Sequence, residues 1–373
     1  MHFFEVLREL LERAGVDLSV SYGQGMRFED LKKDSGALAW ASRVRNMYIA
    51  YGERYLVWQP LPEDPSNYSL IVLSQENRVL SNYPLMMRRA FGGPKLAFWG
   101  HGANLQGNSH RVMQKLKAYT ATKVDWWFAY TGLSADIVSS SGFPKSKITT
   151  VNNAVDTTRL CLDRQSVTVE QQTALRERLS LSPGLVGAFV GSFHADKRLD
   201  FLIKACELTK ERIPGFQMLV VGDGPDRSII ELATRKHKWI HWVGAQYGSE
   251  KALYVSLADV LLNPGMVGLG VLDSFVFGVP LLTTNCNIHS LETTYLRHGP
   301  EITYLRHGIN GLITENTLDA FVGTLSNLLK DRSALNSMKQ NCLSDATTYT
   351  VERMAENFAG GIIRCLEEGE SHG

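Results

Sequence analysis

The chain has 373 residues, a formal net charge of +1 and 44% hydrophobic residues. This length is sufficient for two domains with complete cores, and the balanced charge excludes a general electrostatic attraction to nucleic acid or to acidic partners. The five cysteines show no CxxC spacing, which argues against a disulfide framework or a zinc site. No apolar run reaches the roughly 20 residues of a membrane-spanning helix. We therefore expect a cytoplasmic protein.

Short apolar segments alternate with stretches of helical periodicity, a pattern typical of β–α–β units. In the first half of the chain, strands are predicted at 17–22, 55–58, 70–73, 95–99, 126–130 and 148–151. In the second half, strands are predicted at 185–190, 217–221, 240–243, 260–262, 281–284 and 311–313. These two series predict two α/β domains with parallel sheets.

A polar segment rich in Gln, Arg and Ser separates the two series at 156–183. The boundary is predicted near residue 165, which gives a first domain over 1–165 and a second domain over 166–349. The remaining segment, 350–373, has apolar residues at helical spacing and no strand after it. We expect it to form a terminal helix that packs back on the first domain.

The most informative segment, Asn263–Thr284, reads NPGMVGLGVLDSFVFGVPLLTT. Gly265, Gly268 and Gly270 leave backbone N–H groups open to an anion, and the helix expected after them directs its positive end to the same place. Asp273 falls about one turn inside that helix, within reach of a sugar hydroxyl of the same ligand. The alternative is a loop that needs glycine for its turns, followed by an Asp that the helix dipole favours.

Three motifs precede this segment in the chain. They read VNNAVDTTRL at 151–160, FVGSFHADKRLDFLIKA at 189–205 and LVVGDGPD at 219–226. As a dinucleotide-binding fingerprint the third motif fails, because Arg227 stands where a third glycine is required. The order of the motifs is therefore more informative than any one of them.

The first half offers one candidate of its own, FWGHGANLQ at 98–106. His101 follows a predicted buried strand, at the edge where open α/β sheets bind ligands. A histidine that only caps or packs the edge of the core is the alternative. The aromatic run at 125–130 is predicted to pack in the core rather than to stack on a sugar.

Together these motifs resemble glycosyltransferase family 4, over residues 147–315 and more weakly over 95–135. The resemblance implies the GT-B fold, in which two Rossmann-like, doubly wound domains face each other across a cleft. It also implies transfer of a sugar from a nucleotide-sugar donor with retention of configuration. The donor would bind mainly to the second domain and the acceptor to the first.

In the family, an Arg and a Lys five residues apart hold the donor diphosphate. The matching positions here are Ser192 and Lys197, and Arg198 can restore the missing charge from the neighbouring position. The resemblance also places a His of the first domain at the reaction centre, which corresponds to His101. The expected catalytic residues are therefore His101, Lys197 and Arg198.

Family members also carry two glutamates eight positions apart, where this chain has Gly265 and Asp273. The resemblance assigns the ribose hydroxyls to Asp273. The sugar contact of the first glutamate would pass to the N–H groups of 266–268, or to Glu292 or Glu301. The full set of expected donor contacts is Gly191, Ser192, Lys197, Gly265, Met266, Val267, Gly268, Leu269, Gly270 and Asp273.

No cofactor or metal is expected, because helix dipoles, backbone amides and Lys197 can take up the leaving diphosphate. The expected partners are a nucleotide sugar and a glycan or lipid-linked acceptor, as in bacterial surface-polysaccharide assembly. Arg88, Arg89 and Lys95 form either a site of peripheral membrane contact or a solvated basic face. Two rival functions are a nucleotide-sugar epimerase on the same fold and a non-catalytic partner subunit.

One further feature is a short echo, in which Tyr-Leu-Arg-His-Gly occurs at 295–299 and again at 304–308. The period is too short and too isolated for a repeat protein. We interpret it as a local duplication in a surface loop.

Overall fold

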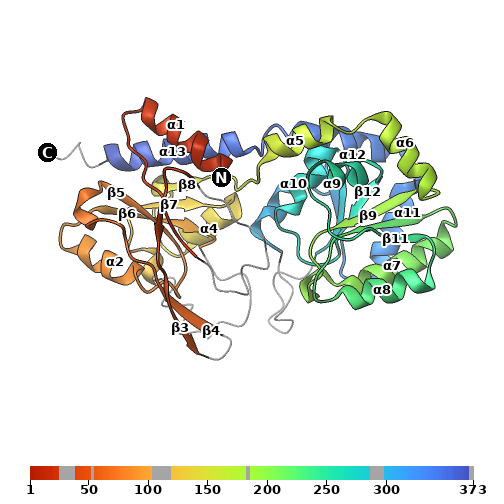
Figure 1. Ribbon diagram of the computed structural model, residues 1–373, viewed down its shortest axis with the longest axis horizontal. Helices are drawn as coiled ribbons and strands as arrows, with labels where there is room; N and C mark the ends of the chain where they lie inside the picture. Colours follow the sequence, from red (N-terminus) through yellow and green to blue (C-terminus); the bar gives the residue numbers. More distant parts are fainter. Residues whose placement is uncertain (25–37, 52–53, 103–118, 182–184, 286–297, 369–373) are drawn as a thin grey trace. The chain divides into compact units, whose positions relative to one another are not determined.

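The structure is a computed structural model that describes residues 1–24, 38–51, 54–102, 119–181, 185–285 and 298–368 (Figure 1). Its contacts divide the chain into two compact units. Of the described residues, the first unit holds those up to Asn152 together with those from Glu352 onward, and the second unit holds Asn153–Val351. The fold is mixed α/β with parallel sheets, as the sequence predicts.

The first unit contains a parallel sheet whose four strands follow chain order: β5 (Leu70–Ser74), β6 (Lys95–Gly100), β7 (Trp126–Ala129) and β8 (Ile148–Thr150). Its helices are α1 (His2–Arg13), α2 (Asn82–Ala90), α4 (Gly132–Ser140) and most of α13 (Val351–Glu367). The side chains of β7 are fully enclosed, so its aromatic residues belong to the core.

Two further strand pairs of the first unit lie outside this sheet. β1 (Ser21–Gly23) pairs in parallel with β2 (Ser42–Val44), and β3 (Met47–Tyr51) pairs antiparallel with β4 (Arg54–Trp58). The predicted strand at 55–58 is therefore present, but in a hairpin rather than in the parallel sheet. β2 and β3 are not predicted from the sequence.

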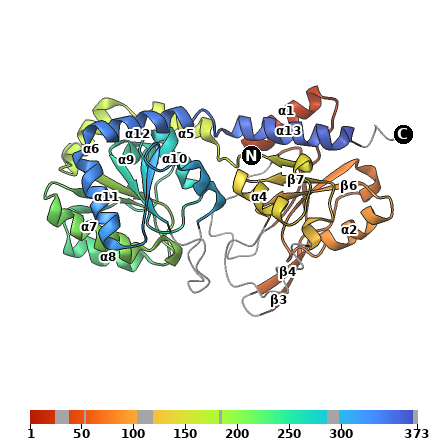
Figure 2. The same ribbon diagram turned by 180° about the vertical axis from the view of Figure 1, so that it is seen from behind.

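The terminal helix α13 packs within the first unit, where α1 runs beside it (Figure 2). Its apolar residues recur at helical spacing and are buried, and Phe358 stacks on Phe128 with ring centroids 4.0 Å apart. At its other end, Lys95 Nζ donates to the carbonyl oxygens of Cys365 and Leu366 at 2.6 and 2.9 Å. An amphipathic helix after the last strand thus completes the first unit.

The second unit contains a parallel sheet in the order β11-β10-β9-β12-β13-β14. The strands are β9 (Val186–Val190), β10 (Gln217–Val221), β11 (Ile240–Trp242), β12 (Val260–Leu262), β13 (Leu281–Thr284) and β14 (Gly311–Thr314). This is the doubly wound order of a Rossmann fold, and the strand order reverses between β9 and β12. All six strands lie where the sequence predicts them.

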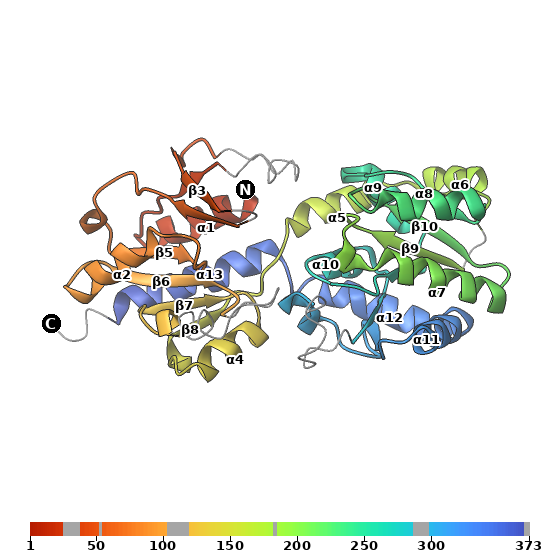
Figure 3. The ribbon, with the colours of Figure 1, turned by 90° about the horizontal axis from the view of Figure 1, so that it is seen from below.

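Helices cover both faces of this sheet, with α9 and α11 on opposite sides (Figure 3). The helices of the unit are α5 (Thr157–Gln165), α6 (Val169–Arg178), α7 (Leu199–Arg212), α8 (Arg227–Lys236), α9 (Gly248–Ser256), α10 (Gly270–Phe277), α11 (Leu318–Lys330) and α12 (Arg332–Asp345). The division of contacts falls after Asn152, since α5 packs against α9 and α10. The expected boundary near residue 165 lies after this division, at the end of α5, which belongs to the second unit.

Candidate donor site in the second unit

Two loops meet at the carboxyl edge of the second sheet, where its strand order reverses. One connects β9 to α7 and the other connects β12 to α10. In open α/β sheets, ligands bind in the crevice at this point, because the connections that follow the two neighbouring strands run to opposite faces of the sheet. The structure thus brings the predicted residues 191–198 and 265–273 to one edge.

Backbone contacts lock the two loops together. The N–H of Met266 donates to the carbonyl oxygen of Asp196 at 2.8 Å, and Lys197 Nζ donates to the carbonyl oxygen of Met266 at 2.5 Å. A Cβ added to Gly265 would lie 2.0 Å from the Asp196 oxygen. The glycine at 265 is therefore required by the close approach of the two backbones.

A second segment holds the glycine loop from its other side. The N–H of Val267 donates to His298 Nδ1 at 3.0 Å, and the N–H of Gly299 donates to the carbonyl oxygen of Val267 at 2.8 Å. His298 Nε2 lies 2.7 Å from the carbonyl oxygen of Thr284, which fixes the neutral tautomer with its proton on Nε2. Burial lowers the pKa of His298 and keeps the ring neutral, and the charge of Lys197 adds to this effect.

His298 and Gly299 are the last two residues of the first copy of the sequence echo. His298 is only 6% exposed, so the interpretation of the echo as a surface loop is wrong at this position. Residues 295–297 and the candidate Glu292 lie outside the described part of the chain. The repeated His-Gly pair is the one feature of the sequence that marks this segment, but nothing in the sequence indicates that His298 contacts Val267, 31 residues earlier.

The open backbone donors lie further along the loop than Met266 and Val267. The N–H groups of Gly268, Leu269 and Gly270 have no hydrogen-bond acceptor among the described residues, and they stand at the N-terminus of α10. A Cβ added to Gly268 or Gly270 would meet nothing within 4 Å. Three adjacent N–H groups at a helix N-terminus, with no acceptor in the described part of the chain, form a suitable anion site.

Lys197 and Arg198 place their positive charges at this edge. The Lys197 side chain is 16% exposed, and burial lowers its pKa, which Asp196 partly opposes. Arg198 adopts a left-handed backbone conformation with φ 55°, and its guanidinium donates to the carbonyl oxygen of Pro264 at 3.3 Å and to Asn316. Ser192 is exposed on the same loop.

The turn after β10 supports the β9 loop rather than adding a ligand contact. A Cβ on Gly222 would lie 1.9 Å from the carbonyl oxygen of Gly191, and one on Gly224 would lie 2.6 Å from that of Phe193. These glycines allow the two turns to touch. The Gly-Asp-Gly-Pro motif therefore has a packing role in this structure.

The two candidate acids that the structure describes, Asp273 and Glu301, have different surroundings. Asp273, in the first turn of α10, accepts a hydrogen bond from Lys251 Nζ at 2.8 Å, and both side chains are mostly buried. Glu301, in the short helix η5 (Pro300–Tyr304), is 4% exposed, and its Oε1 accepts from Asn153 Nδ2 at 3.0 Å. No motif in the sequence indicates that Lys251 pairs with Asp273.

His101 belongs to the first unit and follows β6, as predicted. Its ring meets Tyr130 edge to face, with centroids 4.3 Å apart. The rest of the predicted motif, from residue 103 to 106, lies outside the described residues. In the ranges that the structure describes, no group of three or more His, Cys, Asp or Glu side chains is arranged to hold a metal.

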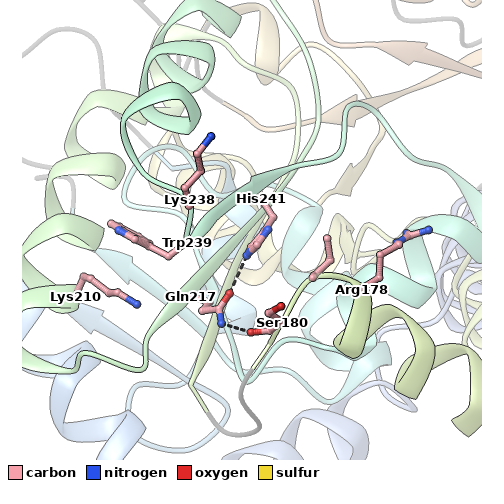
Figure 4. Close-up of a pocket in the computed structure, with 8 residues that line it drawn as sticks. Arg178, Ser180, Lys210, Gln217, Lys238, Trp239 and His241 are labelled. Carbon is pink, nitrogen blue, oxygen red and sulfur yellow. Dashed lines mark hydrogen bonds between the residues drawn. The ribbon is translucent and has the colours of Figure 1, made fainter.

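A separate hollow of about 500 Å³ lies at the opposite, amino edge of the second sheet (Figure 4). Gln217 and His241 join at 2.8 Å near its centre, and Gln217 also donates to the carbonyl oxygen of Ser180. The charged ends of Arg178 and Lys238 point away from these groups (Figure 4). This hollow lies at the other edge from the glycine loop, and its polar centre is already hydrogen-bonded within the protein.

Comparison with known families identifies the segment that carries both loops. Residues 184–331 match the model of the family Glycosyl transferases group 1. A curated relative, the alpha-monoglucosyldiacylglycerol synthase of Acholeplasma laidlawii, is 25% identical over 126 residues. That match covers 32% of this chain and 32% of the relative, so it spans about a third of the relative's length.

Solved structures resemble nearly the whole chain. HepE of Anabaena in complex with UDP matches with a TM-score of 0.65 and 12% identity, over 96% of this chain and 95% of HepE. A glycosyltransferase from Rickettsia africae ESF-5 matches with a TM-score of 0.67 and 12% identity, over 100% and 95%. HepE was also solved with UDP-glucose, and that structure gives a TM-score of 0.63 at 13% identity, over 96% and 94%. The chain thus has the GT-B fold, as the sequence predicts.

Proposed function

We propose that this chain is a retaining glycosyltransferase that binds a nucleotide sugar at the carboxyl edge of its second sheet. The observation that carries the proposal is the combination of three open N–H groups at 268–270 with the buried ammonium of Lys197 at the same edge. Two negative phosphate groups fit a helix N-terminus flanked by a cation. The UDP and UDP-glucose complexes of HepE support this choice of ligand.

In the proposed reaction, the bond between the anomeric carbon and the diphosphate breaks and negative charge develops on the leaving phosphate. Lys197 and the N-terminus of α10 stabilise that charge, with Arg198 on the same loop. The departing phosphate oxygen takes the proton of the acceptor hydroxyl, which attacks from the same face. Asp273 accepts a hydrogen bond from the ribose through the carboxylate oxygen that does not face Lys251, and His101 orients the sugar. No metal is required in this scheme.

The test is to incubate the protein with UDP-glucose, GDP-mannose, dTDP-rhamnose and ADP-glucose, with and without diacylglycerol or oligosaccharide acceptors. We expect acceptor-dependent release of one free nucleotide. Isomerised sugar without any acceptor would instead support an epimerase. A protein that binds none of these nucleotides would support the non-catalytic subunit and contradict the proposal.

The three basic residues considered for membrane contact form ion pairs or hydrogen bonds within the protein. Arg89 forms two bonds of 2.7 and 2.6 Å with Asp125, and Arg88 lies 2.8 Å from Asp64. Lys95 binds two carbonyl oxygens of α13, as described above. Arg89 and Lys95 are thus engaged within the protein, whereas Arg88 is exposed beside Asp64. Within the described ranges, no helix has the length and the apolar character of a membrane span.

The hairpin of β3 and β4 is a better candidate for contact with a lipid surface. One of its faces presents two opposed pairs of exposed apolar side chains: Met47 with Trp58, and Ile49 with Leu56. The exposed Arg43 and Arg45 precede β3. Apolar side chains, a tryptophan and neighbouring cations together suit the interface of an anionic bilayer. We propose that this face contacts such a membrane and gives access to a lipid-linked acceptor.

Flotation with phosphatidylcholine vesicles, with and without phosphatidylglycerol, checks this contact. The wild-type protein should float with the anionic vesicles, and the double variant Ile49→Glu/Leu56→Glu should not. The matched control is Leu162→Glu, which changes a similarly exposed leucine on α5 of the second unit. Equal flotation of the wild type and the double variant would exclude the hairpin, and a changed oligomeric state of the double variant would indicate self-association instead.

A further inference from the structure

The glycine loop has no room for a carboxylate at its first position. A Cβ on Gly265 would meet the backbone of both Asp196 and Lys197, at 2.0 and 2.7 Å. The same backbone carries the hydrogen bond between Asp196 and Met266. A carboxylate that contacts a ligand at this loop must therefore come from another segment of the chain.

Glu301 reaches the glycine loop from the segment that flanks it. A Cβ added to Gly299 would lie 2.7 Å from Glu301 Oε2, 3.1 Å from the carbonyl oxygen of Val267 and 3.3 Å from the Cα of Gly268. Glu301 Oε2 and the backbone of 267–268 thus border the same side of Gly299. Gly268 and Gly299 place no side chain next to the Glu301 carboxylate. A Cβ added to Gly268 would meet nothing within 4 Å.

The burial and hydrogen bonding of Glu301 are unusual for a carboxylate with a purely structural role. Its side chain is 4% exposed, and within the described part of the chain no cation forms an ion pair with it. Its Oε1 accepts a hydrogen bond from a neutral amide, that of Asn153, whose backbone carbonyl oxygen accepts from the Tyr304 hydroxyl at 3.1 Å. A buried carboxylate with so little compensation is costly to remove from water.

We propose that Glu301 recognises the sugar of the donor, with Oε2 accepting a hydrogen bond from a hydroxyl of the transferred hexose. This inference rests on the proposed function and assigns one more residue to the same site. Asn153 holds Oε1 and so fixes the orientation of the other oxygen. The N–H groups at 268–270 take the phosphates, while the carboxylate, which only accepts, suits hydroxyl donors. Glu301 is then a specificity-determining residue for the sugar rather than for the nucleotide.

The experiment compares the dissociation constants of a nucleotide sugar and of its free nucleotide by calorimetry. The probes are UDP-glucose, GDP-mannose, dTDP-rhamnose and ADP-glucose, each with its own diphosphate. In Glu301→Gln the amide oxygen can still accept from Asn153, so the fold should be kept. We expect the variant to bind the sugar nucleotide about tenfold more weakly and the free nucleotide equally well. Glu301→Asp keeps the charge but has a shorter side chain. Its affinity for the sugar nucleotide should lie between those of the wild type and of Glu301→Gln.

The matched control is Glu211→Gln, the same change at an exposed position of α7. It should alter neither constant. If Glu301→Gln binds the sugar nucleotide as tightly as the wild type, the inference is wrong and the proposed function stands. If the variant loses affinity for the free nucleotide to the same extent, Glu301 is structural. If the wild type binds none of the probes, the proposed function fails and the inference fails with it.

Discussion

Both edges of the second sheet carry cationic side chains, but these side chains differ in burial and in hydrogen-bond partners. At the carboxyl edge, the mostly buried Lys197 bonds to the backbone of the neighbouring loop, beside N–H donors that have no acceptor in the described part of the chain. At the amino edge, Lys238 and Arg178 extend into solvent, and Lys210 donates to the carbonyl oxygen of Phe216 at 2.8 Å. Cations at the ends of helices compensate the exposed carbonyls there. A buried cation next to unfilled N–H groups therefore indicates a ligand site better than the number of cations does.

The largest effect is expected from breaking the contact between the two loops of the carboxyl edge. Gly265→Ala places a Cβ against the Asp196 backbone, so the loops must separate. We expect the free energy of unfolding to fall by about 2 kcal/mol, together with a loss of nucleotide binding, as measured by thermal denaturation and calorimetry. Gly268→Ala is the control, because its Cβ meets nothing within 4 Å. Equal stability of the two variants would mean that the loops do not touch.

A smaller effect, on nucleotide affinity, is predicted for Asp273, the proposed ribose contact. Asp273→Asn removes the charge that pairs with Lys251 and weakens the acceptor offered to a ribose hydroxyl. We expect about tenfold weaker binding of both the nucleotide and the nucleotide sugar. Calorimetry measures both, and an unchanged dissociation constant for the free nucleotide would show that Asp273 contacts no part of it.

The smallest effect concerns alkaline pH. Burial lowers the pKa of Lys197, so its ammonium loses its proton at a lower pH than an ordinary lysine. Nucleotide affinity should therefore decline as pH rises toward the usual lysine pKa, while Lys197→Arg should show no such decline. The unfolded chain keeps this proton longer, so the free energy of unfolding contributed by Lys197 rises with pH over the same window. A pH-independent affinity in the wild type would contradict a charged Lys197 at the phosphates.

The second sheet could be predicted almost completely from the sequence, because its strands are apolar runs bounded by Gly, Pro or polar residues. β3 was not predicted, since its apolar side chains face outward and its alternation resembles no buried strand. The hairpin shows that a correct strand at 55–58 does not determine the sheet it joins. Strand identity is local, whereas pairing depends on segments far apart in the chain.

The candidate site could be predicted only where one segment carries the information. The glycine loop, Lys197 and Asp273 are visible as a motif, but their partners are not. His298 and Lys251 come from other segments and meet the loop only through folding. The occupied N–H groups at 266 and 267 show the same limit, because sequence reasoning could not tell which donors remain open.

The most direct test of the account is the affinity for the free nucleoside diphosphate of the active donor, compared between Lys197→Met and Lys238→Met by calorimetry. The two variants remove one cation from each edge of the same sheet. We predict about thirtyfold weaker binding for Lys197→Met and no change for Lys238→Met, with both proteins folded by thermal denaturation. Equal affinities, or a loss only in Lys238→Met, would contradict a donor site at the carboxyl edge.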